Sequence, residues 1–165
     1  MKREIKFRGK RIDNKEWVYG HYCELAGRKY IIPDYSQFRD IHDADLENSF
    51  TEIIPETVGQ FIGLKDKNGK EIYEGDIVKW DDQSDSRYWR FAVVELDPDI
   101  QFNCKPLKQV NGVDNSTDHL FRFGNFIYKD TENYLEIISN IHDKAQQKQA
   151  LIDMMRGDEE LGLYD

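Results

Sequence analysis

Polar and apolar residues alternate over residues 4–8, with the two-residue period of a half-buried β-strand. Residues 17–22 and 29–32 are rich in aromatic and β-branched residues, and they are interpreted as the second and third strands. Gly9 is expected to end the first strand, and the turn-forming residues 13–15 separate it from the second. We therefore expect an N-terminal antiparallel meander over residues 1–57, which includes an exposed acidic loop between residues 34 and 50.

The most specific local pattern is the run Lys65-Asp66-Lys67-Asn68-Gly69-Lys70, which stands between two apolar runs. Asn-Gly is the preferred pair for a two-residue type I′ turn, in which both central residues have positive φ. The pattern predicts a tight hairpin with Asn68 and Gly69 at its turn. The four charged residues of the run are expected to form a solvated cluster at the hairpin tip.

A second turn is predicted at Gly75 and Asp76, which lead directly into the apolar residues 77–79. Glycine permits a sharp entry into a strand, and an aspartate can hold such a turn by accepting hydrogen bonds from backbone amides. This arrangement is typical of small SH3-like barrels. We therefore expect an SH3-like β-barrel within residues 58–141, and we interpret the motif as structural first and as a contact loop second.

The C-terminal half continues the β pattern and ends in a helix. Residues 88–96 are the most β-prone run, residues 97–118 are expected to form a loop, and strands are expected near residues 120–128 and 134–141. Asp143 and Gln146 form a capping box, which begins a short helix that ends at Gly157. Residues 142–165 are thus expected to hold this helix and an acidic tail, and the fold class is mainly β with a minor α component.

Composition limits the compartment and the partners. The formal net charge is −9, which repels phosphate backbones and membrane headgroups in general. The sequence contains neither a run of about 20 apolar residues nor an N-terminal apolar segment of a secretory signal, so we expect a cytoplasmic protein. Cys23 and Cys104 have no metal-binding spacing and are expected to be reduced thiols.

Three segments together resemble the YopX family of phage and prophage proteins. They are Arg3-Glu4-Ile5-Lys6-Phe7-Arg8, the run from Ile62 to Val78 that contains both predicted turns, and Leu135-Glu136-Ile137-Ile138-Ser139-Asn140-Ile141-His142. The family commonly has glycine where Ser139 stands, and an Asn-Pro type of turn where Lys144 and Ala145 stand. The resemblance implies a fold class, a phage origin and a location in a bacterial host cell. It implies no catalytic residues.

Candidate chemistry is sparse. Asp40, His42, Asp43 and Asp45 lie close together in sequence but lack the spacing of a calcium loop, so a solvated acidic loop is favoured. His21 and Cys23 share one face of a predicted strand, but a catalytic cysteine also needs an oriented base and an electropositive setting. We therefore predict no catalytic residues, no metal ligands and no cofactor, and we expect that the protein is not an enzyme.

Basic and aromatic residues interleave in one strand. The candidate binding surface consists of Arg87, Tyr88, Trp89, Arg90 and Arg122. Such residues stack on bases and contact phosphates in proteins that bind single strands, but they also occur in subunit interfaces and cores. We favour an accessory protein that acts by binding an unknown host or phage protein as a homo-oligomer, with no membrane partner. A nucleic-acid-binding protein is the alternative.

Overall fold

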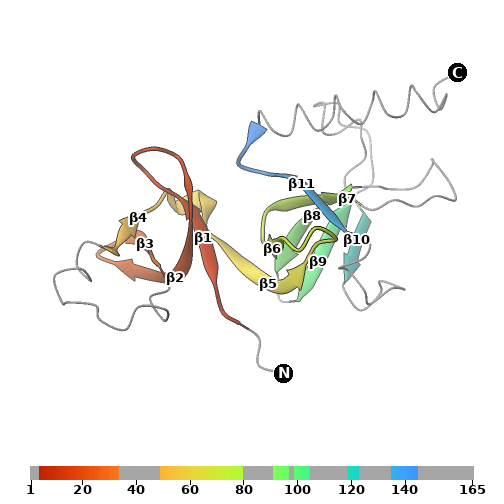
Figure 1. Ribbon diagram of the computed structural model, residues 1–165, viewed down its shortest axis with the longest axis horizontal. Coiled ribbons are helices and arrows are strands. Elements are labelled where there is room, and N and C mark those ends of the chain that lie inside the picture. Colours follow the sequence, from red (N-terminus) through yellow and green to blue (C-terminus); the bar gives the residue numbers. More distant parts are fainter. Residues whose placement is uncertain are drawn as a thin grey trace, which may run out of the picture. The chain divides into compact units, whose positions relative to one another are not determined.

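The computed structural model describes residues 4–33, 49–79, 91–96, 99–104, 119–122 and 135–144. Of these residues, 62% lie in strands and 6% are helical, and the strands form two antiparallel sheets (Figure 1). The predicted mainly β fold class is confirmed. The C-terminal helix, predicted for residues 143–157, lies outside the described residues from residue 145 onward.

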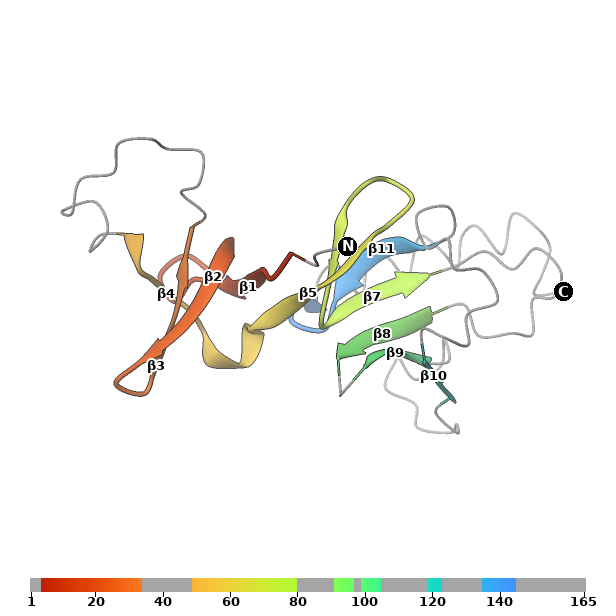
Figure 2. The ribbon, with the colours of Figure 1, turned by 90° about the horizontal axis from the view of Figure 1, so that it is seen from below.

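The chain divides into two compact units, Met1–Gly63 and Leu64–Asp165. The N-terminal unit contains β1 (Phe7–Lys10), β2 (Trp17–Leu25), β3 (Arg28–Ile32), β4 (Thr51–Glu52), the 3-10 turn η1 (Pro55–Thr57) and most of β5 (Gly59–Lys65). Its strands are arranged in the order β4-β3-β2-β1-β5, and neighbouring strands are antiparallel (Figure 2). Strands β1 to β4 follow one another in space as in sequence, so the predicted meander is confirmed.

The first strand continues through Gly9, which we had expected to end it. Gly9 lies inside β1 opposite Val18. A Cβ atom at this position would lie 2.5 Å from Cδ1 of Ile53, a side chain with no exposed surface. The sequence rule failed here because the glycine makes room for a core side chain, so it does not stop the strand.

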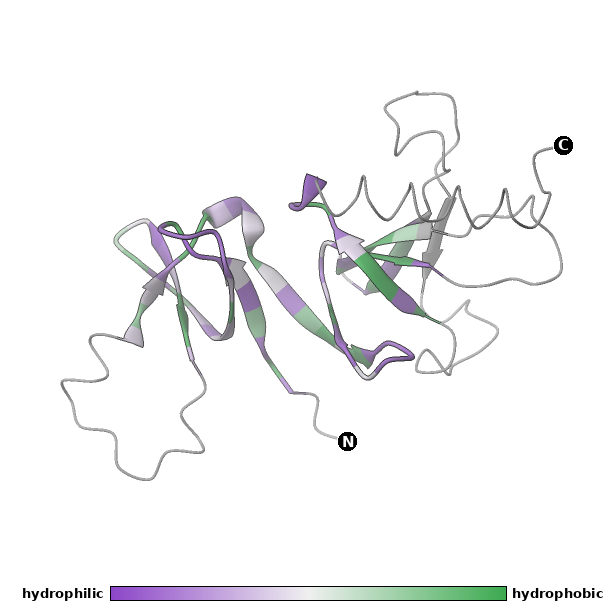
Figure 3. Cartoon of the chain, turned by 45° about the horizontal axis from the view of Figure 1, so that its top comes forward, coloured by the Kyte–Doolittle hydropathy of each residue, from purple (hydrophilic) through white to green (hydrophobic). Residues whose placement is uncertain are grey.

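The strand register divides the side chains of this sheet between two faces, and hydrophilic and hydrophobic segments both occur along β1 and β5 (Figure 3). On one face, the rings of Phe7 and Tyr22 are 5.5 Å apart, and Ile31 is fully buried. The other face carries Arg8 opposite Tyr19 and Lys10 opposite Trp17. The first face supplies apolar core, whereas the second carries cationic and aromatic side chains.

The C-terminal unit contains β6 (Glu71–Tyr73), β7 (Asp76–Lys79), β8 (Phe91–Leu96), β9 (Ile100–Cys104), β10 (His119–Arg122) and β11 (Glu136–Asn140). Strand β6 follows β5 through the predicted hairpin, and the second sheet has the order β10-β9-β8-β7-β11. Among the described residues of this unit, the apolar core consists of Ile72, Tyr73, Ile77, Val78, Ala92, Val94, Phe102 and Leu135. Closure as an SH3-like barrel, and the division at residues 57 and 141, stay predictions.

Strand β9 corrects the expectation of a loop over residues 97–118. All five of its residues pair with β8, from Ala92 opposite Cys104 to Leu96 opposite Ile100. Phe102 is fully buried at its centre. Gln and Asn have weak intrinsic strand preference, but pairing along the whole strand and burial of one aromatic ring override that preference. No helix in the described part of the chain is long and apolar enough to cross a membrane.

Candidate functional site

The predicted basic and aromatic surface falls mostly outside the described residues. Residues 87–90, which supply Arg87, Tyr88, Trp89 and Arg90, are not among them. Arg122 ends β10, where its backbone pairs with Gln101. This candidate surface therefore stays a prediction, as does the interpretation of Asp40, His42, Asp43 and Asp45 as a solvated loop.

His21 and Cys23 lie in β2, opposite Ile32 and Tyr30 respectively, and share a face as expected. His21 is exposed, and Cys23 is a half-buried free thiol. Within the described ranges, no group of three or more His, Cys, Asp and Glu side chains is arranged to hold a metal ion.

The hairpin turn differs from the predicted type. The amide of Gly69 donates to the carbonyl of Asp66 at 3.0 Å, and the amide of Asp66 donates to the carbonyl of Lys70 at 2.8 Å. Gly69 has the positive φ that the sequence predicts, 78°, whereas Asn68 is not among the described non-glycine residues with positive φ. The loop therefore has three residues and one left-handed position, and the prediction of a two-residue type I′ turn is wrong.

Asp66 is the second correction in this hairpin. Lys65, Lys67 and Lys70 are exposed as expected, but Asp66 is only 1% exposed. Its Oδ1 atom accepts hydrogen bonds from the amides of Asn68 and Lys70, each at 2.9 Å. The carboxylate is buried because it satisfies backbone donors that the turn leaves without strand partners.

The other oxygen of Asp66 reaches a distant strand. Its Oδ2 atom accepts a hydrogen bond from the amide of Ile137 in β11 at 3.0 Å, and the amide of Lys67 donates to the carbonyl of Leu135 at 2.8 Å. Strand β11 pairs with β7 along its opposite edge. The hairpin turn thus caps a sheet edge that would otherwise present unpaired backbone groups.

The second turn is held in a related way. The Oδ2 atom of Asp76, a residue 1% exposed, accepts a hydrogen bond from the amide of Tyr73 at 2.8 Å. Gly75 has φ of 83°, its amide donates to the carbonyl of Val94, and its carbonyl accepts from the amide of Ile141. The Gly-Asp pair therefore joins three segments of the C-terminal unit.

An ion-pair network lies beside the capped edge. The carboxylate of Glu136 is 2.7 Å from Nζ of Lys67 and 3.4 Å from Nζ of Lys79. The hydrogen bond from Lys67 lowers the pKa of Glu136, and Lys79 contributes in the same direction. One lysine comes from the hairpin and the other from β7, so the network joins the three elements through partly exposed side chains.

The N-terminal sheet carries a second cluster, which we call the Trp17 face. It consists of Lys6, Arg8 and Lys10 from the β1 segment and Trp17, Tyr19 and His21 from β2. The guanidinium carbon of Arg8 lies 4.4 Å from the centroid of the Trp17 ring, and Nζ of Lys10 lies 5.3 Å from it. Both distances are within the range of cation–π attraction. Tyr19 is 45% exposed.

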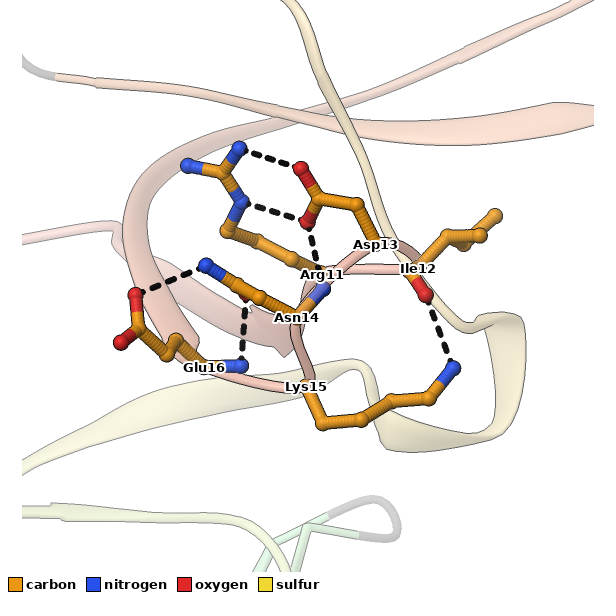
Figure 4. A network of polar contacts seen from close by, with 6 residues as sticks. All are labelled: Arg11, Ile12, Asp13, Asn14, Lys15 and Glu16. Atoms are coloured by element: carbon orange, nitrogen blue, oxygen red, sulfur yellow. Dashed lines mark hydrogen bonds and ion pairs between the residues drawn. The ribbon is translucent and has the colours of Figure 1, made fainter.

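The loop between β1 and β2 is organised by its own polar groups (Figure 4). Arg11 donates two hydrogen bonds to Asp13, at 2.8 and 2.6 Å, and the side chain of Asn14 bonds with both the amide and the carboxylate of Glu16. The hydrogen bonds from Arg11 lower the pKa of the exposed Asp13 to about 2. The guanidinium of Arg11 is therefore engaged within the loop, and the loop orients the two strands of the Trp17 face.

Sequence reasoning did not identify the Trp17 face, although its signal was present. Lys6, Arg8 and Lys10 occupy alternate positions of one predicted strand, and Trp17, Tyr19 and His21 occupy alternate positions of the next. Whether two such rows lie on the same face of the sheet depends on the register between the two strands, which the sequence does not give. The register that pairs Arg8 with Tyr19 supplies this information.

In a comparison with known protein families, the family described as YopX protein matches residues 6–147, a range that includes the meander, both turns and β11. No curated protein matches the chain.

Proposed function

Because the chain belongs to the YopX family, we propose that it is a phage or prophage accessory protein that acts by binding in the bacterial cytoplasm and not by catalysis. The most specific motif of the sequence supports this proposal through what its residues already do. Asp66 and Asp76 are buried and accept hydrogen bonds from backbone amides. Their carboxylates are engaged in folding, which leaves surface recognition as the function that the described residues favour.

The observation that carries the proposal is the Trp17 face. Arg8 and Lys10 hold the Trp17 ring by cation–π contacts, and Tyr19 beside them presents an exposed ring. An aromatic side chain has few rotatable bonds, so it contributes contact area on binding at a low cost in conformational entropy. Aromatic residues are enriched at the centres of binding surfaces. This face is therefore proposed as the recognition surface.

Self-association forms the second part of the proposal and is assigned to the opposite end of the same sheet face. This end consists of Leu25, Tyr30 and Phe50, and we call it the Leu25 end. Leu25 is 54% exposed, Phe50 is 37% exposed, and the rings of Tyr30 and Phe50 are 6.1 Å apart in an edge-to-face arrangement. A small domain buries too little apolar surface by itself to be very stable. A second copy that covered this apolar cluster would increase the buried apolar surface.

Light scattering of the full chain at micromolar concentration tests self-association. We expect a dimer or larger oligomer, and we expect the Leu25→Lys variant to be monomeric because it places a charge in an apolar contact. Ile12→Lys is the matched control, since Ile12 is a comparably exposed apolar residue, 44% exposed, that lies in the β1–β2 loop and is not part of the Leu25 end. A wild-type protein that is monomeric throughout this range contradicts the assignment.

Recognition through the Trp17 face is tested by affinity capture from phage-infected host cells. We expect the wild-type chain to retain a partner that the Tyr19→Ser variant loses. Tyr30→Ser serves as the control, because Tyr30 belongs to the Leu25 end. Equal recovery of the same partners by the wild-type and Tyr19→Ser proteins would show that binding, if present, uses another surface.

A further inference from the structure

Positive charge is concentrated in the N-terminal strands of a chain that is acidic overall. Residues 4–33 contain seven Lys and Arg against four Asp and Glu, a formal charge of +3, whereas the whole chain carries −9. Three of these cations occupy alternate positions on one face, at Lys6, Arg8 and Lys10. Glu4 precedes them in the same alternation, and its largely exposed carboxylate lies 3.7 Å from Nζ of Lys6. The residues that β2 contributes to that face, at positions 17, 19, 21, 23 and 25, include no acid.

Aromatic rings stand directly beside this row of cations. Lys10 pairs with Trp17 and Arg8 pairs with Tyr19 in the β1–β2 register. The side chain of Arg8 is buried with its guanidinium over the Trp17 ring, so it positions that ring. Lys10 and Lys6 are half-buried, while Tyr19 and His21 are exposed. The surface therefore offers the positioned ring of Trp17 and the exposed ring of Tyr19, with ammonium groups alongside them.

We propose that the Trp17 face binds single-stranded nucleic acid, an inference that rests on the proposed function and names the partner of its recognition surface. Tyr19 and Trp17 stack on unpaired bases, and Lys6 and Lys10 contact the phosphates that follow them. Every base has a π-face, so this recognition tolerates sequence differences. A duplex keeps its bases stacked on one another, so the same face binds single strands in preference to duplexes.

The inference places nucleic acid on β1 and β2, and not on the Arg87, Trp89 and Arg122 surface that the sequence suggested. The row of cations on β1 favours it, because a phosphate chain on this face meets Lys6 and Lys10 beside the aromatic rings. Arg11 contributes little to this excess, since its guanidinium is bound to Asp13.

Fluorescence anisotropy of a labelled oligothymidine of about 15 nucleotides, titrated with the full chain at low ionic strength, tests the inference. Two phosphate contacts predict that log K falls with log salt with a slope of about −1.4. The Tyr19→Leu variant should weaken binding at least about fivefold, as expected for the loss of one stacked base. Lys10→Gln should weaken binding and reduce the slope by about 0.7.

Arg28→Gln is the matched control. It removes one positive charge from the same sheet face, but Arg28 lies at the Leu25 end, where its side chain is 66% exposed and 3.7 Å from Glu52. Its binding should equal that of the wild type. The melting temperatures of the Tyr19→Leu and Lys10→Gln proteins should stay close to that of the wild type, which separates loss of the surface from loss of the fold.

Three results would each overturn the inference. The first is no anisotropy change at low salt, and the second is an equal loss of binding in Lys10→Gln and Arg28→Gln, which indicates general charge attraction. The third is displacement by polyglutamate as effective as displacement by unlabelled oligothymidine, which indicates an acidic protein partner. If any of these results is obtained, but the wild-type protein still captures a protein from nuclease-treated cells that Tyr19→Ser does not capture, the inference fails and the proposed function stands. If Tyr19→Ser also changes no capture, both fail.

Discussion

The carboxylate of Asp66 accepts a hydrogen bond from the backbone amide of Ile137 at 3.0 Å, although 71 residues separate the two in the chain. The same side chain accepts two amides of its own turn through its other oxygen. One buried acid therefore fixes both the shape of the hairpin and the edge of the second sheet. This double role explains why the charge is inside, where an unpaired carboxylate would be unfavourable.

Removing this carboxylate should destabilise the protein strongly. Asp66→Ala leaves three backbone donors without their acceptor, and hydrogen bonds to charged groups contribute about 1.5–3 kcal/mol each. Because water reaches part of the turn after the change, we expect a loss of about 2–4 kcal/mol in the free energy of unfolding, measured by urea denaturation. Asp13→Ala, in an exposed turn, should cost much less than Asp66→Ala, because solvent screens its ion pair. Similar costs for the two variants would show that Asp66 does not organise the unit.

At Gly69 the free-energy cost of placing a side chain on a residue with positive φ can be measured without a steric contribution. A Cβ atom there would meet no other atom within 4 Å, so only the positive φ of 78° opposes a side chain. We expect Gly69→Val to lower stability by about 1 kcal/mol or more, and Gly69→Asn by only a few tenths, because Asn tolerates this conformation. Thermal melts of the two variants provide the comparison, and equal melting temperatures would contradict it.

The ion pair of Glu136 should contribute much less than Asp66, although both acids link the hairpin to β11. The side chain of Glu136 is 28% exposed and that of Lys67 is 36% exposed, so water screens the pair. We therefore expect Glu136→Gln to lower the free energy of unfolding by about 0.5 kcal/mol, measured in urea. Since the pKa of Glu136 is lowered in the folded protein, its contribution is present above its unfolded pKa and declines as pH falls through the folded value. The cost of Glu136→Gln should therefore disappear in acid, and a cost that grows in acid would contradict this sign.

The pKa of Asp13 reports the order of the β1–β2 loop. Titration of the wild-type carboxyl by nuclear magnetic resonance should give a pKa of about 2. In Arg11→Gln the pKa should rise toward the ordinary value of 3.8, because the hydrogen bonds from the guanidinium are the largest cause of its depression. A wild-type pKa near the ordinary value would show that the pair is open in solution.

Local patterns predicted the strands more successfully than they predicted the environments of individual side chains. The alternation around Phe7 and the apolar runs at Trp17 and Tyr30 were sufficient for the meander, because turn-forming residues separate each run from the next. Gly9 and the β9 residue Phe102 were misjudged for the same reason. Their conformations are set by Ile53 and by β8, which are partners distant in sequence.

The same distinction holds for the candidate sites. Asp66 stands two residues before Asn68 in a turn sequence, where an aspartate commonly accepts a hydrogen bond from the backbone amide two residues on. This local signal could have indicated that the carboxylate of Asp66 is engaged within the turn. Its bond to Ile137 had no signal, because no spacing in the sequence relates the two residues. The Trp17 face likewise depended on a register between strands, whereas each row of alternating residues was visible in the sequence.

The capped edge of β11 also has a consequence for the order of events in folding. The strands of the meander pair with their neighbours in sequence, so two strands can pair as soon as both have been synthesised. The contact between Asp66 and Ile137 must close a loop of 71 residues, which delays it relative to local pairings. During synthesis the carboxylate of Asp66 therefore stays in contact with water until β11 has emerged from the ribosome. In pulse-labelled hydrogen exchange, the amide of Ile137 should accordingly become protected later than the amides of β2.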